Sequence, residues 1–263
     1  MLTKYINFDA KSLHKLATNG LCRQRLKEQL DFGVDTSLEI FNAQGLEIVK
    51  SKGNYYFATK FLPIEKADFC IVDIETNGSK VGEHQIIEIA GVKVKNGEII
   101  DKFESLVKCD KINEIITELT GISVEDTKDA PNLKEVLQKF KIFLGNSIFV
   151  AHDVKFDFKF ISDSFLHIGE EAILNRYLCS LALAERTVES YRYALSYLND
   201  TYKLNPNPNH HRAMSDVLTT YGLFKLSMKN CEESMNNVED LIKFSKNGKR
   251  LKRPKFDPFL ETE

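Results

Sequence analysis

The sequence lacks any apolar run long enough to cross a membrane. No stretch approaches about 18 uninterrupted apolar residues, and the opening segment, MLTKYINFDAKS, lacks the apolar centre of a signal peptide. The five cysteines are an odd number and include no Cys-x-x-Cys pair, so reduced thiols fit better than a disulfide or zinc framework. These absences favour a cytoplasmic protein without a membrane partner.

Excess positive charge is confined to one segment near the end of the chain. The 263 residues carry a net charge of −2, yet residues 243–255 hold seven Lys or Arg and no acid, which leaves about −9 for the remainder. This basic end is either a solvated, disordered segment or a contact for nucleic acid or a protein. The hydrophobic share of 43% is enough for one substantial core and a small second domain.

Residues 1–66 are predicted to form a small α+β domain. Helices are expected at 13–18 and 23–30, and the segment DTS at 35–37 offers N-cap side chains for a third helix. The strand-like segments LEIVK and YYFAT follow, with SKGN between them as a tight turn. Three short helices followed by a hairpin resemble a winged-helix module.

Residues 67–230 are predicted to form an α/β domain. FCIVDIET, HQIIEIAGVKV and EIIDKFESLV are strand-like, and Asn96-Gly97 between the last two is a strong hairpin signal. A helix is expected at 131–144, where Pro131 suits the first turn, and a short buried strand, SIFVAH, follows it. Three antiparallel strands followed by alternating helices and strands imply a mixed sheet flanked by helices.

Two carboxylates end the first of these strands. Asp73 and Glu75 are two residues apart, so their side chains share one face, roughly 6–7 Å apart along the backbone. Asp157 follows the strand SIFVA at the start of a helix, and Asp216 lies in a helix after a Pro-Asn loop. His211 precedes Asp216 by five residues, about 140° away around a helix, and is therefore expected in the loop.

Carboxylates gathered at a strand end favour a hard divalent cation. Mg²⁺ and Mn²⁺ prefer oxygen ligands, and two such ions about 3.5–4 Å apart stabilise the attacking and leaving oxygens of a phosphoryl displacement. A nearby histidine can take the proton from the attacking water. The residues therefore predict a two-metal phosphodiester hydrolase.

Four segments in order resemble the motifs of the DEDDh 3′–5′ exonuclease family, which includes the proofreading epsilon subunits of bacterial DNA polymerase III. The segments are DIET at 73–76, LTGI at 119–122, VAHDVKFD at 150–157 and HRAMSD at 211–216. The resemblance covers about residues 68–228 and implies a ribonuclease H-like fold.

The resemblance also implies a role for each of five residues. Asp73, Glu75 and Asp216 would ligate the metal on the nucleophile side, Asp73 would also bridge to the second ion, and Asp157 would hold that ion largely through water. His211 would be the general base, because the family spacing is His-x-x-x-x-Asp and His210 fits it less well. The backbone around Ile74 and Thr76 and the LTGI segment would contact the terminal nucleotide, with Ile122 as an apolar wedge beside the base. The substrate-binding residues expected from this resemblance are Ile74, Thr76, Thr120, Ile122, His152 and Phe156.

Three features stay open at the level of the sequence. His152 either contacts the substrate or orients its neighbours through hydrogen bonds. Many family members have Asn where this chain has Asp153, which is either a solvated loop residue or a further outer ligand. The aromatic residues of ESYRYALSYL have helical spacing, and a place in the core is preferred over a platform for stacking bases.

The predicted function is removal of nucleoside monophosphates from DNA 3′ ends by a proofreading enzyme. The alternatives are a family member that acts on RNA or short oligonucleotides, and a non-catalytic nucleic-acid-binding module. Residues 231–263 are predicted to be a flexible basic tail that binds the polymerase catalytic subunit or a sliding clamp. Its apolar anchors would be Phe256, Phe259 and Leu260, and a nonspecific grip on DNA is the competing interpretation.

Overall fold

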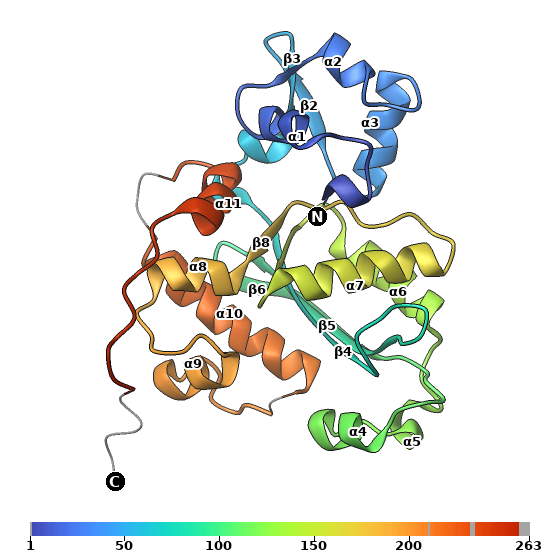
Figure 1. The fold of residues 1–263 in the computed structure, drawn as a ribbon, viewed down its shortest axis with the longest axis vertical. Helices are drawn as coiled ribbons and strands as arrows, with labels where there is room; N and C mark the ends of the chain where they lie inside the picture. The colour runs from blue at the N-terminus through green and yellow to red at the C-terminus, as the bar shows by residue number, and fades with distance from the viewer. Residues whose placement is uncertain (1, 210, 232–234, 258–263) are drawn as a thin grey trace.

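A small N-terminal module of helices around a three-stranded sheet lies above a larger sheet that helices flank (Figure 1). The structure is a computed structural model that describes residues 2–209, 211–231 and 235–257. His210, Phe259 and Leu260 lie outside the described residues. Among the helices that are described, none has the length and apolar character needed to cross a bilayer.

The N-terminal module contains the three helices and the hairpin that the sequence predicts. The helices are α1 (Ala10–Ala17), α2 (Arg23–Lys27) and α3 (Val34–Ala43), the hairpin strands are β2 (Ile48–Ser51) and β3 (Asn54–Phe57), and 3₁₀ turns cover Leu2–Lys4, Ala58–Lys60 and Ile64–Lys66. A short strand that the sequence analysis missed, β1 (Leu21–Cys22), pairs antiparallel with β3. The expected N-cap of the third helix is wrong, because α3 begins after Gly33 and already includes the DTS segment.

The larger sheet has the strand order β6-β5-β4-β7-β8. Its strands are β4 (Phe69–Thr76), β5 (Ile86–Lys95), β6 (Glu98–Leu106), β7 (Ile148–Ala151) and β8 (Tyr177–Cys179). The first three form the predicted antiparallel meander, and the pairings of β4 with β7 and of β7 with β8 are parallel. This mixed sheet confirms the predicted α/β class.

Helices cover both faces of the larger sheet. They are α4 (Glu114–Thr120), α5 (Val124–Thr127), α6 (Leu133–Leu144), α7 (Val154–His167), α8 (Ser180–Thr187), α9 (Leu195–Tyr202), α10 (Ala213–Lys229) and α11 (Val238–Asn247). The apolar core on one face includes residues of α6 and α7, and the core on the other face includes residues of α10 and α11. The sheet is therefore the middle layer of three.

Strand β4 alternates its side chains between these two cores. Cys70 and Val72 join the core of α6 and α7, whereas Ile71 joins the core of α10 and α11. The same alternation continues to the end of the strand, so Asp73 and Glu75 are on the face that α10 covers. The fold thereby directs both carboxylates toward one helix.

The N-terminal module packs directly against the α/β part. Leu2, Ile6 and Phe8 belong to the same apolar core as Phe149 and Phe165. The Lys4 ammonium also forms an ion pair with Asp163 on α7. The two parts share a core, and the boundary near residue 66 stays a prediction.

Residues 238–257 pack against the rest of the protein, unlike the flexible tail expected from residue 231. Helix α11 buries three apolar side chains, Val238, Leu241 and Ile242. Its Glu239 accepts hydrogen bonds from Arg176 at 2.6 and 2.7 Å. The sequence analysis missed this helix because its buried apolar residues span only 238–242 and basic residues follow them directly.

Candidate active site

The candidate site lies at the carboxyl end of β4, beside the first turns of α7 and α10. Asp157, in the first turn of α7, is only 4% exposed. The charged group with the greatest effect on Asp73 is Asp157, followed by Glu75 and Asp216. The structure thus gathers, from one strand and two helices, the four carboxylates that the sequence analysis singled out.

His211 lies next to two of these carboxylates. Ligand atoms of Glu75, His211 and Asp216 all lie within 4.8 Å of one another. His211 precedes α10 in a left-handed turn with a φ of 62°, and its backbone N–H donates to the Asp216 carboxylate at 3.1 Å. The predicted location of His211 outside the helix is confirmed, and its side chain is exposed to solvent.

Burial and crowding raise the pKa values of the carboxyl groups. Burial, and then the charges of Asp157 and Glu75, raise the pKa of Asp73 well above its usual range. Burial, and then the charge of Asp216, raise the pKa of Glu75 to about 8. Burial raises the pKa of Asp157 to about 7, although backbone hydrogen bonds oppose the shift. At neutral pH such a cluster holds either protons or a compensating cation.

The donor set fits divalent metal ions. Carboxylate oxygens are the ligands that Mg²⁺ and Mn²⁺ prefer, and four of them meet at this point of the sheet. The cation whose charge lowers the pKa of Glu75 is Arg212, and its guanidinium is already bound to Glu88. Most of the negative charge of the cluster is therefore left for other cations to neutralise.

A buried ion pair that the sequence analysis missed fixes the start of α10. Glu88, which pairs with Glu75 across β4 and β5, is 1% exposed. It accepts hydrogen bonds from Arg212 Nη2 at 2.7 Å and from the backbone N–H of Ala213 at 2.9 Å. Arg212 thereby ties the helix to the sheet directly beside His211. In the sequence, the signal for this ion pair was Glu88 itself, a single acid within the apolar segment IIEIAGV.

The LTGI segment was predicted to contact the terminal nucleotide, but two of its side chains face the protein instead. Gly121 ends α4 in the left-handed conformation, with a φ of 70°, and the chain then turns Ile122 into a buried apolar cluster. Ile122 is 1% exposed, so the expected apolar wedge is wrong. The Thr120 hydroxyl accepts from the N–H of Ile122 at 3.1 Å and donates to the C=O of Ile116 at 2.8 Å, so it serves this turn.

The other predicted substrate contacts differ in their exposure. Ile74 is buried, Thr76 is half-buried at the end of β4, and Phe156 is 43% exposed in the first turn of α7. Further exposed apolar side chains on α4 and α5 are Ile115, Leu119 and Val124. Phe156 therefore keeps a surface that a substrate can contact, and the expected contact through the backbone around Ile74 and Thr76 stays a prediction.

His152 supports the framework of the site. Its Nε2 lies 2.9 Å from the C=O of Tyr193, and its Nδ1 lies 3.1 Å from the Ser180 hydroxyl oxygen. Burial lowers the pKa of the imidazole. A neutral ring that donates through Nε2 and accepts at Nδ1 satisfies both contacts. The structure therefore favours the orienting role of His152 over a direct contact with the substrate.

Asp153 lies at the rim of the site. It is exposed and occupies the N-cap position of α7, with a φ of 58°, and its side chain makes no capping hydrogen bond. Its charge contributes to the raised pKa of Asp157. A role for Asp153 as an outer ligand stays a prediction.

Comparisons with known proteins identify the family of this chain. The family model for exonuclease, RNase_T, matches residues 70–224, a range that includes all five predicted catalytic residues. Curated relatives include the PolC-type DNA polymerase III of Staphylococcus saprophyticus, 36% identical over 188 residues, and that of Staphylococcus haemolyticus, 35% identical over 193 residues. The two matches cover 70% and 72% of this chain, but this chain spans only 13% of each relative.

Solved structures share the same architecture. Exonuclease X in complex with 5′ overhanging duplex DNA has a TM-score of 0.54 and 27% identity, and the match covers 67% of this chain and 99% of that one. Exonuclease I has a TM-score of 0.56 and 16% identity over 63% of this chain and 41% of its own, and supports the fold alone. The predicted ribonuclease H-like fold is confirmed. With a family model that spans more than half of its length, the chain belongs to the exonuclease family.

Proposed function

We propose that this protein is a metal-dependent exonuclease that removes nucleoside monophosphates from the 3′ ends of DNA. The observation that carries the proposal is the convergence of Asp73, Glu75, Asp157 and Asp216 at the end of β4, with His211 beside them. The raised pKa values of three of these carboxyls support a site that cations neutralise.

The carboxylates and His211 have different roles at the scissile phosphate. Asp73, Glu75 and Asp216 would hold one Mg²⁺ or Mn²⁺ ion, and Asp73 and Asp157 a second. Bound ions would stabilise negative charge on the attacking and leaving oxygens. His211 accepts the proton of the attacking water, and the carboxylates of Glu75 and Asp216, within 4.8 Å, stabilise the imidazolium that forms.

The relatives support DNA as the substrate. One solved structure of the same fold is Exonuclease X in complex with 5′ overhanging duplex DNA, and the curated relatives are PolC-type DNA polymerases. We infer that the enzyme excises misincorporated nucleotides for a replicative polymerase. The polymerase catalytic subunit is the first proposed partner and a sliding clamp the second, both through the chain end from the exposed Phe256 onward.

Oligonucleotides labelled at one end test the proposal. With Mg²⁺ and a 5′ label, hydrolysis from the 3′ end gives a ladder that shortens one nucleotide at a time, whereas a 3′ label is released at once as a mononucleotide. A mismatched 3′ end should be removed faster than a paired one, and DNA faster than RNA of the same sequence. Degradation from the 5′ end would contradict the proposal, and faster cleavage of RNA would favour the alternative substrate.

A further inference from the structure

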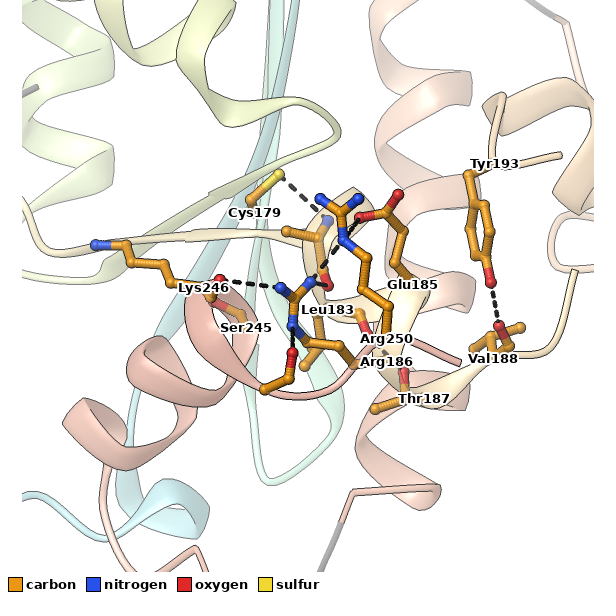
Figure 2. A network of polar contacts seen from close by, with 12 residues as sticks. Cys179, Leu183, Glu185, Arg186, Thr187, Val188, Tyr193, Ser245, Lys246 and Arg250 are labelled. Atoms are coloured by element: carbon orange, nitrogen blue, oxygen red, sulfur yellow. Dashed lines mark hydrogen bonds and ion pairs between the residues drawn. The ribbon is translucent and has the colours of Figure 1, made fainter. Parts of the chain in front are cut away.

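The last described part of the chain is attached to the domain surface at its start. Residues 248–257, here called the basic strap, follow α11 and run past α8 (Figure 1). Arg186 on α8 donates from Nε to the C=O of Gly248 at 2.9 Å, and the N–H of Leu251 donates to the C=O of Glu185 at 2.9 Å. Figure 2 shows Arg186 and Glu185 at the centre of this network.

The far end of the basic strap is attached as well. Asp257 is buried, although it is charged. Its carboxylate accepts a hydrogen bond from the Tyr197 hydroxyl at 2.7 Å and lies 3.4 Å from Arg192 Nε. The basic strap is thus attached to the domain near both of its ends and forms part of the domain surface.

The charge of the basic strap is almost entirely positive. Five of its ten residues are basic, namely Lys249, Arg250, Lys252, Arg253 and Lys255. Arg250 and Arg253 both pair with Glu185, at 3.0 and 3.4 Å. The three lysines are exposed, and within the described part of the chain no ion pair neutralises them. The basic strap therefore offers an open row of positive charge.

Aromatic rings lie among these cations. The Arg192 guanidinium lies 5.7 Å from the Tyr191 ring and 5.9 Å from the Tyr197 ring, and the Arg253 guanidinium lies 5.2 Å from the Tyr193 ring. Tyr193 is buried, as the sequence analysis predicted for this group, but Tyr191 and Tyr197 are half-buried and present part of each ring to solvent. Cations interleaved with aromatic rings are typical of surfaces that bind single-stranded nucleic acid.

Two contacts, from Arg253 to Tyr193 and from Tyr193 to His152, link the basic strap to the candidate active site. Arg253 lies over the ring of Tyr193, and the backbone C=O of Tyr193 is 2.9 Å from Nε2 of His152. His152 directly follows β7, and α7, the helix that carries Asp157, begins two residues later at Val154. The positive surface and the carboxylate cluster thus belong to one connected framework.

We propose that the basic strap binds the phosphate backbone of the substrate strand, on the 5′ side of the 3′ end that occupies the active site. The inference rests on the proposed nuclease function. Lysine side chains bind phosphates as point charges, so the basic strap adds affinity without sequence preference. Leu251, an exposed apolar residue of the strap, is flanked by cations and forms no apolar centre of the kind that a protein interface needs, whereas the proposed protein contact begins only at Phe256.

A triple variant with a matched control tests the inference. K249Q/K252Q/K255Q removes three exposed charges and leaves the attachments of the basic strap in place, and K11Q/K15Q/K27Q removes three exposed lysine charges from α1 and α2. Binding to a long single-stranded DNA is measured by fluorescence anisotropy in EDTA over a range of salt concentrations. Each phosphate contact contributes about −0.7 to the slope of log K against log salt. The slope for the strap variant, which lacks three lysines, should therefore be less negative than that of the wild type by about 2.

The control variant should keep the slope of the wild type. For the strap variant, the KM for long DNA should also rise relative to the KM for a trinucleotide, which has few phosphates for the basic strap to bind. An unchanged slope, or an equal loss in the control, would overturn the inference and favour a protein contact through Leu251 and Phe256. If the wild-type protein fails to hydrolyse either DNA, the proposed function is wrong, and the binding data still decide whether the basic strap holds DNA.

Discussion

Replacing Arg212 by methionine should destabilise the fold, because it leaves the Glu88 carboxylate buried without its cation. Glu88 is 1% exposed, and Arg212 contacts it through Nε at 3.2 Å and Nη2 at 2.7 Å. Removing one partner of a buried ion pair lowers the free energy of unfolding by about 3–5 kcal/mol. The Arg212 side chain is 37% exposed, and the Ala213 N–H still donates to Glu88, so the lower figure, about 3 kcal/mol, is expected.

Urea and thermal unfolding in EDTA, followed by circular dichroism, measure this effect. For a chain of this size 1 kcal/mol shifts the Tm by about 2–4 °C, so Arg212→Met should melt about 6–12 °C lower than the wild type. The double variant Glu88→Gln/Arg212→Met should return to within about 1 kcal/mol of the wild type, because it buries no charge and keeps an acceptor for Ala213. An unchanged stability of Arg212→Met, or a double variant as unstable as the single one, would refute the reasoning.

Three further predictions concern the candidate site. In EDTA the Tm should be highest near pH 4 and fall toward about pH 8, because the folded pKa values of Glu75, about 8, and Asp157, about 7, exceed the unfolded values. Saturating Mg²⁺ should flatten this profile, and a Tm that rises with pH in EDTA would argue against it. His211→Ala should lower kcat about 10²- to 10⁴-fold, with a mild effect for His210→Ala. If His210→Ala caused the large loss of kcat and His211→Ala the mild one, the general base would be His210, one residue before the predicted position. His152→Asn should cost about 1–3 kcal/mol of unfolding free energy through lost contacts with Ser180 and Tyr193. A change in KM at unchanged stability would instead mark His152 as a substrate contact.

Local rules explain two features of the site that could be predicted from the sequence, whereas the joining of Asp157 and Asp216 to Asp73 was implied by the family motifs. Asp73 and Glu75 share a face because the period of a strand is two, and Ile71 sets which face that is by joining the core of α10. The loop position of His211 followed from the helical angle between it and Asp216. Each of these relations depends on neighbours within a few residues, and each is present in the structure.

The missed features depend on partners that are distant in the sequence or on the path of a turn. Glu88 and Arg212 are 124 residues apart, and no local pattern pairs them. Ile122 faces the core because the left-handed Gly121 redirects the chain, a choice that the motif LTGI does not reveal. Helix α11 is held by burial against the sheet and by Arg176, which lies far from it in the sequence.

The rate of single-stranded DNA hydrolysis as a function of Mn²⁺ concentration, in the wild type, Asp73→Asn and Asp101→Asn, tests most directly whether the carboxylate cluster holds the catalytic ions. Asp101 is exposed on the edge strand β6, so its variant is a matched loss of one carboxylate. The wild type and Asp101→Asn should share one metal dependence and lose all activity in EDTA. Asp73→Asn should lose nearly all activity at every Mn²⁺ concentration, while its Tm in EDTA equals or exceeds that of the wild type because a repelling charge is gone. Wild-type activity in EDTA, or full activity of Asp73→Asn, would contradict a metal-dependent mechanism at this site.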